Sequence, residues 1–152
     1  MNWEEVRQRK EDSIRESTGN PMSKSFEVNG KTYSSYTEYS NSDEYKEFLK
    51  INANGISLNA WMIKPPNFDP SKKYPVYFNV YGGPGHNEVL DSWDGSDFMY
   101  HQLLAQKGYI VFSVDPRGTM YQGTKFKKST YLELGKLEIE DIINSAKELT
   151  KL

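Results

Sequence analysis

The sequence lacks several features that would define a class of protein. It contains no cysteine, which excludes disulfide bonds and thiolate metal sites. No apolar run approaches about 18 residues, so no membrane-spanning helix is predicted. The charged first residues hold no apolar signal-peptide segment, and no cluster of basic residues indicates a nucleic-acid surface. Hydrophobic residues make up 36% of the chain, below the roughly 45–50% of globular domains, which predicts a thin core. These absences do not assign the protein to a cellular compartment.

The residues of a nucleophilic triad are also missing from these 152 residues. No Gly-x-Ser-x-Gly elbow is present: Ser113 falls inside a predicted strand, and Ser17 and Ser96 lack flanking glycines. The two histidines, His86 and His101, have no serine or cysteine partner in the sequence pattern. His101 is expected on a helix, whereas His86 lies beside a glycine-rich turn where it could touch a ligand.

No cofactor or metal is expected. The phosphate-binding patterns Gly-x-x-x-x-Gly-Lys and Gly-x-Gly-x-x-Gly do not occur. His86, Asp91, Asp94 and Asp97 are close in sequence, but their spacing matches neither a calcium loop nor a zinc-binding helix. We interpret them as a solvated acidic loop.

Residues 1–44 are predicted to form a polar arm. Trp3–Glu16 is a candidate for a charged helix with opposite charges four residues apart. Phe26–Tyr33 predicts a short hairpin that turns at Asn29-Gly30. Ser34–Asp43 is rich in serine, tyrosine and asparagine and is predicted to be a loop.

Residues 45–152 are predicted to form a packed α/β module. The first two strands should be antiparallel, because Asn54-Gly55 separates them by a tight turn. A strand-helix-strand-helix sequence follows, which predicts a mixed sheet with covering helices. The expected strands are Tyr45–Asn52, Ile56–Ile63, Tyr74–Val80 and Tyr109–Val114, and the expected helices are Ser96–Lys107, capped by Ser96, and Leu134–Leu149. In the last helix one face should be apolar, formed by Ile139, Ile142, Ile143, Ala146 and Leu149.

A glycine-rich turn, Tyr81-Gly82-Gly83-Pro84-Gly85, follows the predicted strand Tyr74–Val80. Acyl-transfer enzymes need rigid hydrogen-bond donors aimed at a developing oxyanion. In α/β-hydrolases one such donor comes from the loop after the third strand, where glycine lets the backbone approach closely. The alternative interpretation is a tight strand-to-helix turn without chemistry.

The next strand ends at Asp115-Pro116-Arg117-Gly118. Arg117 is expected to hold this loop by pairing with Glu138 or Asp141 on the last helix. We prefer this structural role to substrate binding, because strongly interacting ion pairs are often structural.

The stretches LNAWMIKPPNFDPSKKYPVYFNVYGGPG, LLAQKGYIVFSVDPRGTMYQG and LGKLEIEDIINSAKEL resemble the prolyl oligopeptidase family of serine peptidases, in its dipeptidyl peptidase IV-like branch. The match runs collinearly from about Phe48 to Leu149 and corresponds to the N-terminal half of the catalytic α/β-hydrolase domain. The resemblance implies an enzyme that removes dipeptides behind a penultimate proline or alanine, with a β-propeller beside the hydrolase domain.

Functional residues carry over from this resemblance one by one. Tyr81 matches the tyrosine whose hydroxyl helps to form the family's oxyanion hole, and Gly82, Gly83 and Pro84 match the turn that positions it. The remaining matches are framework positions: Asp115, Arg117, Gly118 and Gly123, with Glu140 and Asp141 at an acidic helix start.

The resemblance also implies what this chain needs from elsewhere. The family's serine, aspartate and histidine would all lie beyond Leu152, so we expect a fragment that is inactive alone and acts on peptides only when completed. Its sheet should present an unpaired edge, which favours self-association or pairing with another chain.

Two alternatives remain open. The first is a non-catalytic protein-interaction module derived from a hydrolase half-domain, which would bind partners through the exposed sheet edge. The second is an enzyme with another mechanism, built on Tyr81 and His86.

Overall fold

A computed structural model describes residues 26–28, 31–33, 45–92 and 94–151. The chain divides into two compact units, residues 1–46 and residues 47–152. In the first unit, β1 (Phe26–Val28) pairs antiparallel with β2 (Lys31–Tyr33), which confirms the predicted hairpin. Its turn, the predicted helix Trp3–Glu16 and the predicted loop Ser34–Asp43 lie outside the described residues.

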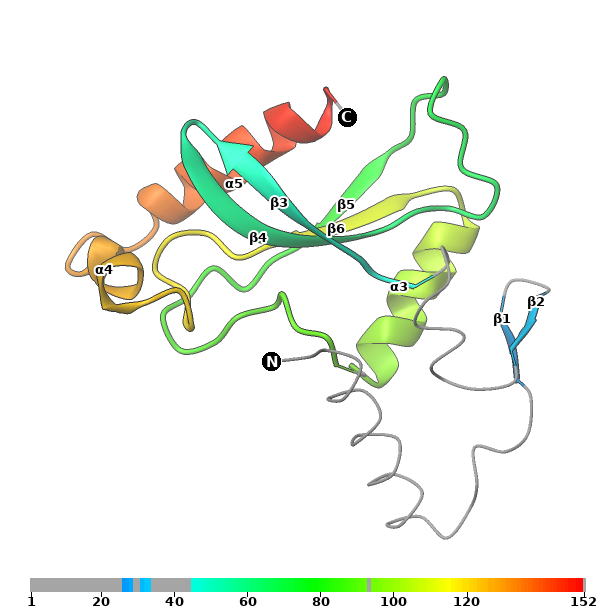
Figure 1. The fold of residues 1–152 in the computed structure, drawn as a ribbon, viewed down its shortest axis with the longest axis horizontal. Helices are drawn as coiled ribbons and strands as arrows, with labels where there is room; N and C mark the ends of the chain where they lie inside the picture. Colours follow the sequence, from blue (N-terminus) through cyan, green and yellow to red (C-terminus); the bar gives the residue numbers. More distant parts are fainter. Residues whose placement is uncertain (1–25, 29–30, 34–44, 93, 152) are drawn as a thin grey trace, which may run out of the picture. The chain divides into compact units, whose positions relative to one another are not determined.

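The second unit is built on a four-stranded mixed sheet in the order β3-β4-β6-β5 (Figure 1). β3 (Glu47–Ala53) and β4 (Ile56–Ile63) form an antiparallel hairpin. β6 (Ile110–Val114) pairs antiparallel with β4 and parallel with β5 (Val76–Asn79). The expected mixed sheet with antiparallel first strands is therefore confirmed.

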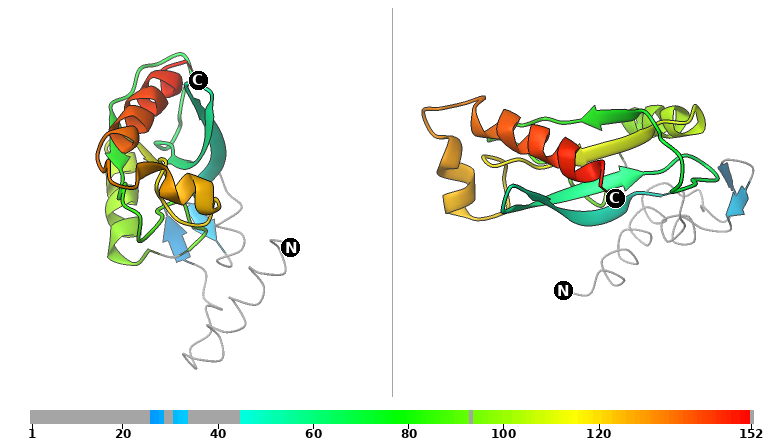
Figure 2. Two further views of the ribbon diagram at one scale, coloured as in Figure 1. Left: turned by 90° about the vertical axis from the view of Figure 1, so that its left-hand side faces the viewer. Right: turned by 90° about the horizontal axis from the view of Figure 1, so that it is seen from above.

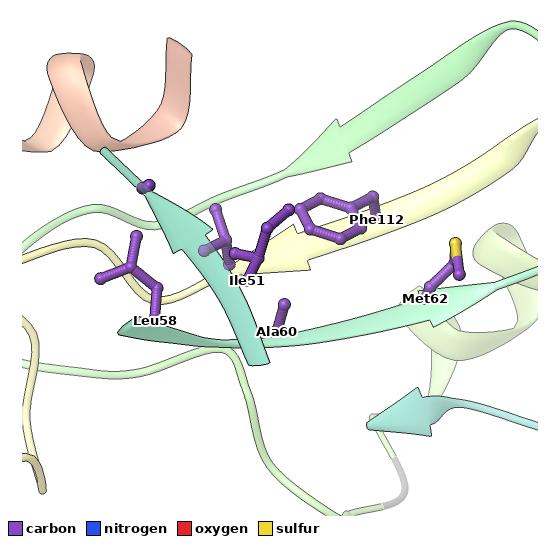
Figure 3. Close-up of a cluster of buried hydrophobic side chains, with 7 residues drawn as sticks. Ile51, Leu58, Ala60, Met62 and Phe112 are labelled. Atoms are coloured by element: carbon purple, nitrogen blue, oxygen red, sulfur yellow. The ribbon is translucent and has the colours of Figure 1, made fainter. Parts of the chain in front are cut away.

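The two faces of the sheet bury different side chains, because successive residues of a strand point to opposite faces. One face carries the main apolar cluster, shown in Figure 3: Ile51, Ala53, Leu58, Ala60, Met62, Phe112 and Val114. Ile142 and Leu149 of α5 (Leu137–Leu149) pack against this cluster. The other face carries Trp61, which stacks against His101 of α3 (Ser96–Gln106) with ring centroids 5.4 Å apart. The sheet therefore lies between two helices.

Figures 1 and 2 show where these helices lie within the second unit. α5, coloured red, lies against the sheet near the end of β3, while α3 lies near the start of β6. A short helix, α4 (Thr124–Lys127), and a 3-10 turn, η1 (Lys128–Thr130), connect β6 to α5. These two short elements have too few residues to produce a hydrophobic period, and the sequence did not predict them.

β5 is shorter and less buried than predicted. The ladder begins at Val76, because Pro75 has no N–H to donate and contributes only its carbonyl, which accepts from Ile110 at 2.9 Å. Val76 is exposed and the three residues after it are only half-buried. β5 is therefore an edge strand, since no other described strand pairs with its outer side. β6 comes later in the sequence but lies inside the sheet, between β4 and β5.

The start of α3 also differs from the prediction. Ser96 is the first helical residue rather than the cap, and Gly95 occupies the cap position with φ 57° and no side-chain hydrogen bond. At the other end, Gly108 follows the cap residue with φ 88°, a left-handed conformation that glycine adopts without strain. The helix itself and its C-terminal glycine are as expected.

The buried face of α5 coincides only in part with the predicted apolar face. Its fully buried residues are polar: Glu138, Asp141 and Ser145. Ile139 is 56% exposed and Ile143 is 49% exposed, whereas Ile142 and Leu149 point to the core. The buried face also holds Asp141, which is paired with Arg117. Hydrophobic periodicity contains no information about such an ion pair.

Candidate active site: the glycine-rich loop after β5

The candidate site lies at one edge of the sheet, where β5 and β6 end together. Phe78 pairs with Phe112 and Asn79 with Ser113, so the two parallel strands finish level with each other. The loop that follows β5 and the loop that follows β6 therefore start side by side. In open α/β sheets this is where ligands bind, outside the carboxyl ends of the strands.

Tyr81 is the second residue of the loop after β5 and is 54% exposed. Gly82 follows with φ 71°, a backbone conformation that glycine adopts without strain. The Tyr81 ring folds back over Gly83: a Cβ added to Gly83 would lie 2.6 Å from Tyr81 Cε1 and 3.2 Å from its hydroxyl oxygen. Any side chain at position 83 would displace this ring. Gly82 therefore allows the chain to turn, and Gly83 leaves room for the Tyr81 ring.

Glu88, in the middle of the loop, forms hydrogen bonds with one residue of β4, one of β5 and one at the end of β6. Its N–H donates to Asp115 Oδ1 at 2.8 Å, and its carbonyl accepts from Trp61 Nε1 at 3.0 Å. Its carboxylate accepts from Asn79 Nδ2 at 3.3 Å. Contacts from β4, β5 and the end of β6 thus converge on one residue and fix the loop to the sheet.

Asp115 is a buried carboxylate, 2% exposed, directly after β6. Its two oxygens accept from the N–H groups of Glu88 and Val89 at 2.8 and 3.2 Å. Burial raises the pKa of Asp115 above its usual value, while those hydrogen bonds act in the opposite direction. The resemblance predicted a framework role for Asp115. In the structure its carboxylate binds the backbone of the loop that carries Tyr81.

His86 lies between Tyr81 and Glu88. Its Nε2 is 3.5 Å from Glu88 Oε1, and its ring meets the Tyr81 ring edge to face, with centroids 5.5 Å apart and planes at 85°. Its carbonyl accepts from the Met120 N–H at 3.5 Å. The structure therefore brings together Tyr81 and His86, the two side chains that the sequence placed near a ligand.

Arg117 pairs with Asp141 as predicted, whereas Glu138 accepts instead from the Gly135 N–H at 3.0 Å. The Asp141 carboxylate, 0% exposed, accepts from Arg117 Nη2 at 2.6 Å, from its Nε at 2.9 and 3.0 Å, and from its backbone N–H at 2.8 Å. Hydrogen bonding to Asp141 raises the pKa of Arg117 above its usual value. Glu140 is more distant, 3.6 Å from Arg117, and half-exposed.

Gly118 explains why this loop passes so close to η1. Its φ is 99°, and a Cβ at this position would lie 2.6 Å from Thr130 Oγ1. Its N–H donates to the Phe126 carbonyl at 3.1 Å. Gly123 has φ 92° and is the N-cap of α4. The glycines of this motif therefore shape the backbone, which is a framework role.

The remaining candidates lie away from this loop. Ser113 is 0% exposed inside β6, where a substrate cannot reach it, and His101 is buried on α3. Across residues 45–92 and 94–151 no three His, Asp or Glu side chains are grouped so that they could hold a metal ion. No helix of the described segments is long and apolar enough to cross a membrane.

Sequence reasoning missed the importance of Glu88 and Asn79. Neither belongs to a motif, and their contacts depend on strand order, which places β6 beside β5. One signal was available: Asn79 and Asp115 each lie at or just after the end of a predicted buried strand, and parallel strands bring such residues to one edge.

Comparison with known proteins identifies the family and supports the fold. Residues 96–152 match the prolyl oligopeptidase family. Dipeptidyl peptidase 4 of Trichophyton equinum is 46% identical over 114 residues, covering 71% of this chain and 15% of the relative. The enzyme of the same name from Trichophyton rubrum is 44% identical over the same span. The chain thus spans about 15% of the length of these curated relatives.

A solved structure gives the same result. The crystal structure of Porphyromonas gingivalis dipeptidyl peptidase 4 superposes with a TM-score of 0.66 at 37% identity, covering 81% of this chain and 18% of the other. The sequence comparison and the structural comparison therefore point to the same family. The chain forms part of an α/β-hydrolase fold of the prolyl oligopeptidase family, in its dipeptidyl peptidase 4-like branch.

Proposed function

We propose that this chain supplies the oxyanion-hole segment of a serine-type dipeptidyl peptidase, with the Tyr81 hydroxyl as the donor. The observation that supports this is the position of Tyr81: it is half-exposed, at the carboxyl end of β5, with its ring laid over Gly83. A donor must be accessible to substrate and yet fixed before the reaction. Tyr81 combines exposure with a fixed ring.

In the proposed reaction a serine attacks the carbonyl of a peptide bond, and negative charge develops on the carbonyl oxygen. The Tyr81 O–H donates to that oxygen and stabilises the charge. The nucleophile, base and acid are proposed to come from polypeptide outside these 152 residues, since no Gly-x-Ser-x-Gly elbow occurs within them. On this proposal the 152 residues alone do not hydrolyse peptides, and no cofactor or metal is required.

The first test is to sequence the source DNA on both sides of this reading frame. A continuing frame that encodes a strand and a Gly-x-Ser-x-Gly elbow supports the proposal. The completed protein is then assayed with a dipeptide nitroanilide such as Gly-Pro-p-nitroanilide. A reading frame that stops after Leu152, with no second half nearby, removes the catalytic proposal and favours an interaction role.

The second test is Tyr81→Phe in the completed protein. We expect kcat to fall by about 10²–10³ with little change in KM, because an oxyanion donor acts mainly in the transition state. Tyr100→Phe is the matched control, since Tyr100 is also half-exposed but lies on α3. A rise in KM at unchanged kcat would assign Tyr81 to substrate binding instead.

A second candidate function is supported by the exposed apolar surface of the module. Ile139 and Ile143 lie one helical turn apart on α5 and are about half-exposed, and β5 is an edge strand. Such features favour binding of another polypeptide, either a second copy or the remainder of a hydrolase domain. Light scattering after gel filtration tests this: association with rising concentration, reduced by Ile143→Lys, supports it, and a monomer at all concentrations contradicts it.

A further inference from the structure

The Tyr81 side chain has two described neighbours that constrain its ring. Gly83 lies against one part of the ring, close enough that a Cβ there would overlap it. The His86 ring meets it edge to face at a centroid distance of 5.5 Å, within the 4.5–7 Å typical of favourable aromatic pairs. Gly83 limits where the Tyr81 ring can go, and His86 is the side chain that can keep it there.

His86 can do this only if it is itself held. It is half-exposed, so burial alone does not fix its ring. Its Nε2 lies 3.5 Å from Glu88 Oε1, and its carbonyl accepts from Met120 N–H in the neighbouring loop. Glu88 in turn is attached to the sheet through Asp115, Trp61 and Asn79. A continuous set of contacts therefore runs from the buried end of β6 to the Tyr81 ring.

We propose that His86, oriented by Glu88, is a positioning residue that holds the Tyr81 hydroxyl in place for the oxyanion. This inference rests on the proposed function of Tyr81. The titratable groups that contact the His86 side chain in the described residues are Glu88 and Tyr81, and Asp115 lies one step further, bonded to the Glu88 amide. The position of the Tyr81 ring therefore depends on the His86 ring and on the Glu88 carboxylate beside it.

The first experiment measures this dependence without relying on catalysis. The 152-residue chain is labelled with ¹³Cζ-tyrosine, and the Tyr81 signal is assigned from Tyr81→Phe. In the parent chain the transverse relaxation of Tyr81 should be faster than that of the exposed Tyr131, because the Tyr81 ring is restrained. In His86→Asn the Tyr81 rate should approach that of Tyr131, and in Glu88→Gln it should lie between the two. The Tyr131 signal, from a side chain that is 75% exposed, is the internal reference and should stay constant.

Several results would overturn the inference. One is a Tyr81 relaxation rate that is the same in His86→Asn as in the parent chain, which would assign the restraint to another group. Another is a Tyr81 rate that already equals that of Tyr131 in the parent chain. Because His86 is half-exposed, its replacement should leave the fold intact, and an unchanged Tyr131 signal together with an unchanged tryptophan emission spectrum verifies this.

The second experiment connects position to rate in the completed enzyme. His86→Asn should lower kcat roughly tenfold with KM nearly constant, a smaller loss than that of Tyr81→Phe. In a Tyr81→Phe background the same change should have no further effect, because its action passes through the hydroxyl that is already absent. An additive loss in the double variant would overturn the positioning role.

The two experiments separate failure of this inference from failure of the proposed function. If Tyr81→Phe lowers kcat but His86→Asn does not, Tyr81 is the donor and the positioning role of His86 is wrong. If Tyr81→Phe leaves kcat unchanged, the oxyanion proposal is wrong, and with it the catalytic part of this inference. The labelled tyrosine still decides in that case whether His86 positions the ring.

Discussion

The Arg117–Asp141 pair gives the sharpest test of what holds the module together. Arg117→Ala removes the Nε and Nη2 donors that contact the Asp141 carboxylate, which is 0% exposed. Removing one member of a buried ion pair costs about 3–5 kcal/mol, because the remaining charge is left without its partner. The backbone N–H of position 117 still donates to Asp141, and the Arg117 side chain is 20% exposed. We therefore expect the lower end, about 3 kcal/mol.

The assay is urea unfolding followed by tryptophan fluorescence, in a Trp3→Phe, Trp93→Phe background that leaves Trp61, which is fully buried in the sheet, as the reporter. With a urea slope of about 1–3 kcal/mol per molar, a loss of about 3 kcal/mol lowers the midpoint by about 1–3 M. Protein concentration is varied tenfold to exclude association. Glu140→Gln is the control, because Glu140 is half-exposed and 3.6 Å from the guanidinium, and we expect it to change stability by less than about 0.5 kcal/mol.

Two further results would test the reasoning. Asp141→Asn in the Arg117→Ala background should recover part of the loss, because a neutral amide is less costly to bury than an unpaired carboxylate. Asp141 raises the pKa of Arg117, so the stability that the guanidinium contributes is present below its unfolded pKa and is lost only in strong alkali. Between pH 6 and 9 the Arg117 guanidinium keeps its charge, so its titration should not change the loss of unfolding free energy caused by Arg117→Ala. If Arg117→Ala behaves like Glu140→Gln, the pair does not hold α5 to the loop.

Three other changes test separate features. Burial raises the pKa of Asp115, so its contribution to stability is full below the unfolded value of 3.8 and declines as pH rises through the folded pKa. Asp115→Asn should therefore lower the free energy of unfolding most in acid, by about 1–3 kcal/mol, and less near neutral pH. Urea unfolding midpoints at several pH values measure this loss. An equal loss at every pH would contradict the reasoning. Gly118→Ala should cost about 2–4 kcal/mol, because its Cβ would overlap Thr130 at a positive φ, whereas Gly55→Ala, which has open space, should cost only about 1. Similar costs for the two would refute the overlap. Ile139→Lys, at a half-exposed position, should change stability by no more than about 0.5 kcal/mol, and a large loss would show that this face is packed.

Sequence patterns predicted the strands and helices of the module because each has a strong local signal. β4 alternates cleanly, and Asn54-Gly55 marks the hairpin, with Asn54 and Gly55 both at positive φ. The polar part of the buried face of α5 could not be predicted from its apolar stripe, since this part includes Asp141, which is paired with Arg117. Periodicity measures hydrophobic burial and carries no information about which carboxylate meets a distant arginine.

The candidate site, like the fold, could be predicted only in part. Tyr81 and its glycines were identified from the turn and the resemblance, because these residues are contiguous. The strand-end positions of Asn79 and Asp115 were visible in the sequence, but their contacts with Glu88 could not be predicted, because these depend on β6 lying between β4 and β5. Strand order is decided by tertiary packing, and a local pattern does not contain it. The role of Tyr81 itself, as an oxyanion donor, stays a prediction.

The interior position of β6 also determines how this sheet can assemble on the ribosome. The β3–β4 hairpin closes locally, with Ala53 opposite Ile56, and can form as soon as it emerges. β5 is synthesised next but has no neighbour to pair with until Ile110–Val114 arrives and bridges it to β4, for example through Ala60 and Val114. Such distant closure is slow compared with local contacts. During synthesis β5 therefore stays unpaired until β6 has emerged, and the glycine-rich turn after β5 is among the last parts of the module to become ordered.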